Sequence, residues 1–153
     1  MGGVAAGEVT MAEPIQIQSP IQSTEFKRDP VLDGATYKLK PPESDHAVYV
    51  TINHAVINGR PRLMEIFVNS KNMEHFAWVV ALTRVISAIF RDESRPTFLV
   101  EELRSVFDPK GGYWVSGRYI PSLVADIGNC LQKHMERLGI ANNAAEPKGD
   151  GHE

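Results

Sequence analysis

The sequence predicts an α+β domain, in which a small antiparallel sheet of at least three strands packs against about three helices. Between residues 36 and 69, apolar and polar residues alternate, which is typical of strands with one buried face. From residue 73 to residue 138, apolar residues instead recur every three or four positions, as they do on helices. Strands followed by helices indicate a sheet that helices cover on one face.

The strands are expected near residues 36–40, 47–57 and 62–69. The second has the clearest pattern, because Val48, Val50 and Ile52 share one face. Asn58-Gly59 then favours a two-residue hairpin turn, since both positions accept a positive φ. In the third strand, Met64, Ile66 and Val68 are expected to face inward, and Leu63, Glu65, Phe67 and Asn69 outward.

Pro61 follows the turn directly and has no backbone N–H to give to a ladder. Within a sheet, proline is confined to edge strands, to the first residue of a strand and to bulges. The third strand is therefore expected to lie at an edge or to carry a bulge.

The first helix is expected at residues 73–91, with Asn72 or Ser70 as its N-cap. Apolar residues nearly encircle it, and its polar stripe consists only of Thr83, Arg84, Ser87 and Arg91. A helix that is apolar almost all round is buried on more than one side. We therefore expect part of it to be covered by other helices or by another chain, such as a second copy.

Two further helices are expected at 98–107 and 121–138. Between them, Ser116-Gly117 fits the turn of a very short hairpin. Pro121 suits the first turn of the last helix, and Gly139 suits the position just past its end.

Length and composition bound the possible classes of protein. The 153 residues, 42% hydrophobic and 23% charged, fit one globular domain. We expect this domain at residues 26–139, between disordered tails at 1–25 and 140–153. The formal net charge is −3, with −3 and −2 in the tails and +2 between them, which does not favour nucleic-acid binding.

Nothing in the sequence predicts a membrane segment. The longest unbroken apolar run covers the seven residues from Phe76 to Leu82, whereas a spanning helix needs about 20. The first ten residues have neither the basic region nor the apolar core of a secretory signal. A cytoplasmic protein without membrane association is therefore expected.

No catalytic or metal-binding motif stands out. The P-loop, GxGxxG, GxSxG and HExxH patterns are absent, and no two of the five histidines share helical i, i+4 spacing. The one cysteine, Cys130, lies beside apolar residues of the last helix, where a small core residue is expected rather than a nucleophile. We expect no catalytic residues, no metal site and no cofactor bound by this chain.

Two segments are candidate binding sites. At a helix start, Ser70, Lys71 and Asn72 could hold an anion with free backbone N–H groups and a lysine, although an ordinary capped connection is the simpler explanation. The second segment comprises Lys110, Gly111, Gly112, Tyr113 and Trp114. Its adjacent aromatic residues could contact a ligand or a partner, or could pack over the domain edge.

The order of motifs resembles that of a known family. LDGATYKLK, YVTIN, NGRPRLMEIFVNSK, ALTRVISAIFR and LVEELRSVFDPKGGYW occur in this order, over roughly residues 30–138. Together they resemble the TSCPD domain, the small C-terminal module of adenosylcobalamin-dependent (class II) ribonucleotide reductases, which also occurs as a separate small protein. The most specific part is GRPRLMEIFVN, from Gly59 to Asn69, followed by the apolar helix.

This resemblance implies a noncatalytic accessory domain or subunit that supports deoxyribonucleotide synthesis. Its expected partner is the large reductase chain, which would carry the adenosylcobalamin. The cysteines that give the family its name are missing here, and a single cysteine forms no redox pair within one chain. We expect no reductase activity from the isolated chain. The alternative is a stand-alone, oligomeric binding module for a nucleotide or another small anion.

Overall fold

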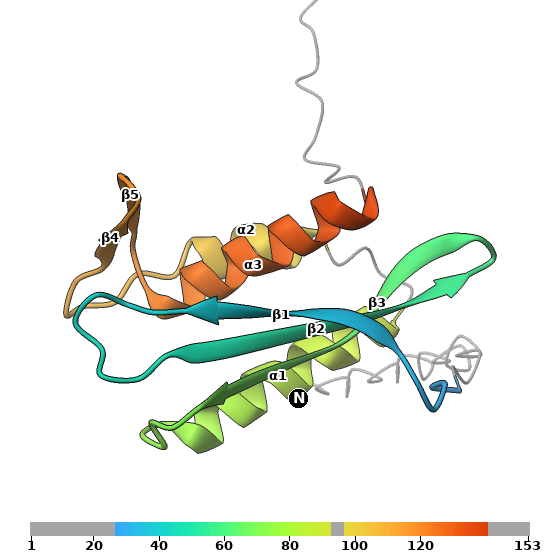
Figure 1. The fold of residues 1–153 in the computed structure, drawn as a ribbon, viewed down its shortest axis with the longest axis horizontal. Helices are drawn as coiled ribbons and strands as arrows, with labels where there is room; N and C mark the ends of the chain where they lie inside the picture. Colours follow the sequence, from blue (N-terminus) through green and yellow to red (C-terminus); the bar gives the residue numbers. More distant parts are fainter. Residues whose placement is uncertain (1–26, 93–96, 141–153) are drawn as a thin grey trace, which may run out of the picture.

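A computed structural model describes residues 27–92 and 97–140. In chain order its elements are β1 (Asp33–Leu39), β2 (Val48–Ile57), β3 (Arg60–Ser70), α1 (Phe76–Arg91), α2 (Phe98–Arg104), β4 (Tyr113–Val115), β5 (Arg118–Ile120) and α3 (Leu123–Leu138). The α+β prediction is confirmed: a three-stranded antiparallel sheet carries the helices on one face (Figure 1). The tails expected at 1–25 and beyond Ile140 lie outside the described residues.

The sheet has the order β1-β2-β3, so β1 and β3 are its edges. Asn58 and Gly59 form the β2–β3 turn with φ values of 52° and 75°, as their sequence predicts. Pro61 lies in β3 opposite Val56, and β3 is the edge strand that Pro61 predicted.

A bulge in β3 makes part of the predicted face assignment wrong. Asn53 pairs with Glu65, but the next residue, His54, pairs with Leu63, so Met64 is the extra residue. The bulge brings Leu63 to the inner face beside Met64, although alternation placed Leu63 outside. Glu65 lies on the outer face as expected, yet it is also buried, because other side chains surround it.

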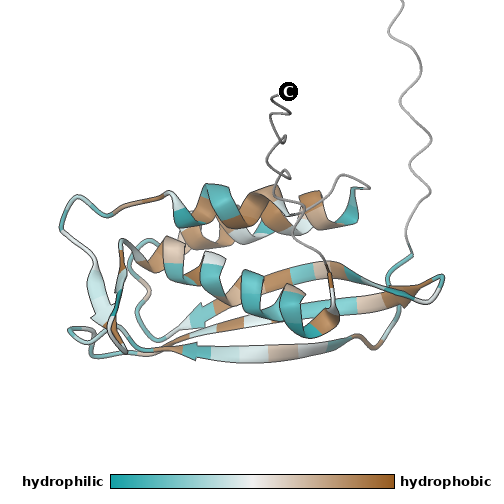
Figure 2. Cartoon of the chain, turned by 90° about the horizontal axis from the view of Figure 1, so that it is seen from above, coloured by the Kyte–Doolittle hydropathy of each residue, from teal (hydrophilic) through white to brown (hydrophobic). Residues whose placement is uncertain are grey.

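The core lies between the inner face of the sheet and the three helices. Figure 2 shows the sheet as one layer and the helices as a second layer on the same side of it. Ile52, Phe90 and Leu131 are among the most deeply buried side chains, and they come from β2, α1 and α3. α1 packs on β3, whereas α3 packs on β1 and β2 and against α2.

α1 begins later than the sequence predicts and turns its hydroxyl groups inward. Its N-cap is His75, whose φ is 62° and whose side chain makes no cap bond, rather than Asn72 or Ser70. Thr83 and Ser87 from the polar stripe are buried on the side of α1 that faces the sheet. Ser87 Oγ accepts from the Ile66 N–H at 3.1 Å and donates to the Ile66 carbonyl at 3.4 Å.

The C-terminal elements follow the sequence signals closely. Ser116 and Gly117, with φ values of 49° and 77°, turn the short β4–β5 hairpin. Ser122, rather than Pro121, starts α3, because its hydroxyl accepts from the Ala125 N–H at 2.9 Å. Gly139 ends α3 in the left-handed conformation, as predicted.

Candidate functional site

The candidate functional site is the face of α1 that points away from the sheet. On this face Trp78 is 78% exposed and Val85 is 58% exposed, whereas Phe76, which is 50% exposed, lies on the side of the helix toward β3. Ala77 and Ala81 lie on the same exposed side of the helix. Since a helix on the surface of a domain normally presents polar residues to water, this exposed apolar face is a candidate contact surface.

A groove continues this face toward the edge of the sheet. It has a volume of ≈ 470 Å³ and runs between α1 and β3; we call it the α1–β3 groove. Its lining comprises Glu65, Ile66, Phe67, Val68, Phe76, Val80, Thr83, Arg84, Ser87, Ala88 and Arg91. Most of this lining is apolar, with two arginines and one carboxylate among it.

The carboxylate in the groove, that of Glu65, is hydrogen-bonded by neighbouring side chains. Glu65 accepts from Arg28 Nε at 3.0 Å, from Arg28 Nη2 at 2.8 Å and from Asn53 Nδ2 at 2.9 Å. The hydrogen bonds from the Arg28 guanidinium hold the pKa of Glu65 below its usual value, so Glu65 is ionised at neutral pH. Because its oxygens already accept these hydrogen bonds, Glu65 is poorly placed to bind a partner's cation.

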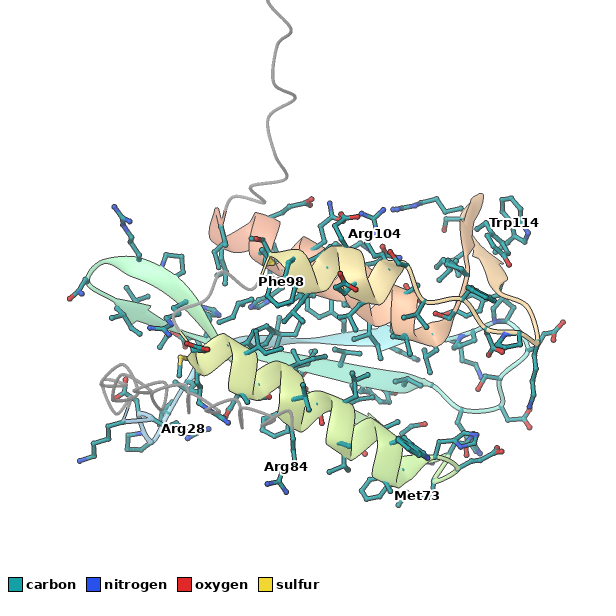
Figure 3. All side chains as sticks on the ribbon, turned by 180° about the vertical axis from the view of Figure 1, so that it is seen from behind. Arg28, Met73, Arg84, Phe98, Arg104 and Trp114 are labelled. Atoms are coloured by element: carbon teal, nitrogen blue, oxygen red, sulfur yellow. The ribbon has the colours of Figure 1, made fainter. Side chains whose placement is uncertain are left out.

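Arg84 is an available charge of this region. Figure 3 shows its side chain extending from α1 away from the sheet and the other helices. Within residues 27–92 and 97–140, its guanidinium has neither a hydrogen-bond nor an ion-pair partner. An apolar face with an unpaired arginine suits a partner surface that is apolar and bears a carboxylate.

The first predicted site, residues 70–72, lies where β3 leads into α1. Ser70 Oγ donates to the Ala47 carbonyl at 3.1 Å and accepts from the Asn72 N–H at 3.2 Å. Asn72 Oδ1 accepts from the Glu74 N–H at 2.9 Å. Ser70 and Asn72 line a cavity of ≈ 200 Å³ together with Glu74, whereas Lys71 does not line it. Anion binding by these three residues stays a prediction.

The second predicted site, residues 110–114, leads into the β4–β5 hairpin. The Lys110 N–H donates to Asp108 Oδ1 at 2.8 Å, and the Gly111 N–H donates to the Asp108 carbonyl, also at 2.8 Å. Gly112 lies so close to the Ile120 carbonyl that a Cβ there would be 2.1 Å from the oxygen. The structure does not bring the two predicted sites together: Met73, beside the first, and Trp114, in the second, lie far apart (Figure 3).

The two aromatic residues of this segment have different surroundings. Tyr113 is half-buried and donates its hydroxyl to Asp126 Oδ2 at 2.8 Å, and burial raises the pKa of Tyr113. Trp114 is 64% exposed and lies 5.4 Å from Tyr119, centroid to centroid, across the hairpin. Tyr113 therefore anchors the hairpin to α3, and Trp114 remains available at the surface.

Three residues distant in sequence form a partly buried hydrogen-bonded chain. The Tyr37 hydroxyl lies 3.0 Å from His134 Nδ1, and His134 Nε2 lies 3.3 Å from His54 Nδ1. His134 is 2% exposed, and burial lowers its pKa to about 4. His134 is thus a neutral structural residue that joins α3 to β1 and β2.

Cys130 is buried in the core, as the sequence predicts. Burial and the nearby Asp126 raise the pKa of Cys130 to about 11, so its thiol stays protonated at neutral pH. Among the described residues, no three His, Cys, Asp or Glu side chains form a group suited to a metal ion. No helix of the described ranges is both long and apolar enough to cross a membrane.

Sequence reasoning missed the groove, although it marked the helix that forms it. The apolar ring of α1 predicted covering by another chain, but it did not show which side would remain exposed. Nor did it pair Phe67 of β3 with α1, because that contact depends on the path of the chain between them. The sequence did hold one signal for the exposed face of α1: at helical spacing, Ala77, Ala81 and Val85 fall on one side of the helix.

Comparison with known proteins gives one match. The family model of the TSCPD domain matches residues 22–135, which is most of the chain and nearly all of the fold described above. Neither the search of curated proteins nor the search of solved structures found a match.

Proposed function

The chain belongs to the TSCPD domain family, and from this premise we propose that it is a noncatalytic accessory subunit or domain of a class II ribonucleotide reductase. In this proposal it supports deoxyribonucleotide synthesis in the cytoplasm by binding the large reductase chain. The partner holds the adenosylcobalamin and carries out the radical chemistry. The observation that carries the proposal is the unpartnered apolar face of α1 in a member of this family.

The energetics of the α1 face support binding to a large partner. Each large apolar side chain that becomes buried contributes roughly 1.5–3 kcal/mol. Phe76, Trp78, Val80 and Val85 are all exposed, so together they offer several such contributions. These offset the roughly 4–15 kcal/mol that association costs in lost freedom of motion.

A noncatalytic role agrees with the state of Cys130. Radical nucleotide reduction in the family uses several cysteines, whereas this chain has one. Its thiol is buried and protonated, which makes it a poor nucleophile and a poor electron relay. Pure protein, supplied with adenosylcobalamin and a reductant, should therefore reduce no ribonucleotide; turnover that Cys130→Ser abolishes would contradict the proposal.

The test is binding to the large class II reductase chain from the same cells, measured by sedimentation and calorimetry. We expect a complex, and we expect Trp78→Ser/Val85→Ser to weaken it at least roughly tenfold, since two hot-spot contacts are lost. The matched control is Val31→Ser/Val56→Ser, which also replaces two exposed apolar residues but lies away from α1. It should leave the complex intact.

Three outcomes would count against the proposal. The wild-type chain does not bind the reductase, both double variants weaken binding equally, or the α1 face holds a second copy of this chain so tightly that the reductase is excluded. In the last case, sedimentation at micromolar concentration shows a dimer that Trp78→Ser/Val85→Ser converts to a monomer.

A further inference from the structure

A further cavity lies at the opposite edge of the sheet from the α1–β3 groove. It has a volume of ≈ 260 Å³ and lies between the end of β1, the β4–β5 hairpin and α3. Figure 1 shows the hairpin beside the end of β1 and the start of α3. No sequence motif marks this cavity, because its β1 wall comes from a segment that lies 75 to 95 residues before the hairpin and α3 residues.

The lining of the cavity is strongly basic. Lys38 and Lys40 come from the end of β1, Arg118 from β5 and Lys133 from α3. Asp126 is the one carboxylate among the lining residues, and it already accepts from the Tyr113 hydroxyl. The cavity therefore carries a formal surplus of positive charge in a chain whose net charge is −3.

Three of these cations have no hydrogen-bond or ion-pair partner among the described residues. Lys40 donates to the Ser44 carbonyl, but Lys38, Arg118 and Lys133 have neither a hydrogen-bond nor an ion-pair partner there. Bringing like charges together costs free energy unless an anion binds between them. Asn129 adds an amide donor to the same wall.

The size of the cavity limits the anion it can take. At ≈ 260 Å³ it is smaller than the roughly 300–1,000 Å³ of pockets that enclose a whole drug-sized ligand. Several converging cations and an amide suit an elongated anion with many acceptor oxygens, and arginine suits phosphate in particular. A bound nucleotide would place its phosphates here and leave its base outside.

We propose that the basic cavity between β1, the β4–β5 hairpin and α3 binds a polyphosphate chain, either that of a nucleoside triphosphate or an inorganic one. This site is separate from the α1–β3 groove. It does not depend on the proposed association with a reductase, since its walls are complete within this chain.

Calorimetry on the full chain tests the site, with ATP, sodium tripolyphosphate and adenosine as probes. ATP, tripolyphosphate or both should bind, more weakly at about 0.15 M salt than at low ionic strength, because salt screens these charges. Adenosine should not bind. Arg118→Gln and Lys133→Gln should each weaken binding roughly tenfold, as expected for loss of one charge-assisted contact.

The matched control is Lys27→Gln/Arg60→Gln, which removes one lysine and one arginine from exposed positions outside the cavity. It should bind like the wild type, and circular dichroism should show that all variants fold. Lys71→Gln tests the other candidate anion site.

Binding of ATP but not tripolyphosphate, or the reverse, supports the proposal and identifies the source of the phosphate chain. The proposal is overturned if neither phosphate probe binds, if adenosine binds as well as ATP, or if the control loses affinity as the cavity variants do. Loss of binding in Lys71→Gln alone would likewise overturn it and place the anion at residues 70–72.

Discussion

Lowering the pH should destabilise the protein through His134. In the folded chain, burial lowers the pKa of His134 to about 4, from its ordinary value of 6.5. Below pH 6.5 the unfolded chain therefore takes up a proton before the folded chain does. Stability falls as the pH decreases from 6.5 toward 4, and the loss is complete once both states are protonated.

The size of this effect follows from the two pKa values. One pKa unit corresponds to about 1.4 kcal/mol, so the full difference is on the order of 3 kcal/mol. Between pH 7 and pH 5 the linkage relation gives a loss of about 2 kcal/mol. This is a large fraction of the roughly 5–15 kcal/mol that stabilises a typical domain.

The assay is urea unfolding, followed by circular dichroism, at several pH values between 7.5 and 4.5. The wild type should lose about 2 kcal/mol more than His134→Gln between pH 7 and pH 5. His46→Gln, which removes an exposed imidazole, should behave like the wild type. An equal loss in His134→Gln and the wild type, or an NMR titration of His134 near pH 6.5, would refute the reasoning.

Three further predictions concern packing, reactivity and charge. Gly128→Ala should cost about 1–3 kcal/mol in urea unfolding, because its Cβ would lie 2.9 Å from Leu103 Cβ; an unchanged midpoint would contradict the close α2–α3 contact. Cys130 should react with Ellman's reagent roughly 100-fold more slowly in the native than in the unfolded chain, and equal rates would contradict its burial. Arg28 lowers the pKa of Glu65, so the free energy of unfolding should fall as the pH drops through that pKa. Arg28→Gln should make this loss of stability at low pH smaller.

Much of the fold could be predicted because its signals are local. The Asn58-Gly59 turn, the Ser116-Gly117 turn and the end of α3 at Gly139 each depend on backbone preferences of one or two residues. Face assignments in β3 failed at Leu63, because a bulge is fixed by pairing with another strand and not by alternation.

The candidate sites were only partly predictable, because they join distant segments. The chain of Tyr37, His54 and His134 spans residues 97 positions apart, and no spacing rule connects them. In the sequence, nothing distinguishes Arg118 and Lys133 from other charged surface residues. They line one cavity only because the hairpin folds beside α3. The sequence placed Trp78 in the apolar helix, but its exposure depends on which side of α1 faces the sheet.

The hydroxyl of Ser87 has a consequence for self-association. β3 is an outer strand, and an open strand edge is a template on which further chains can polymerise as cross-β structure. Ser87 occupies both the N–H and the carbonyl of Ile66, in the middle of that edge. An incoming strand could not complete its hydrogen-bond ladder at Ile66, so Ser87 opposes edge-to-edge pairing of β3 with another chain.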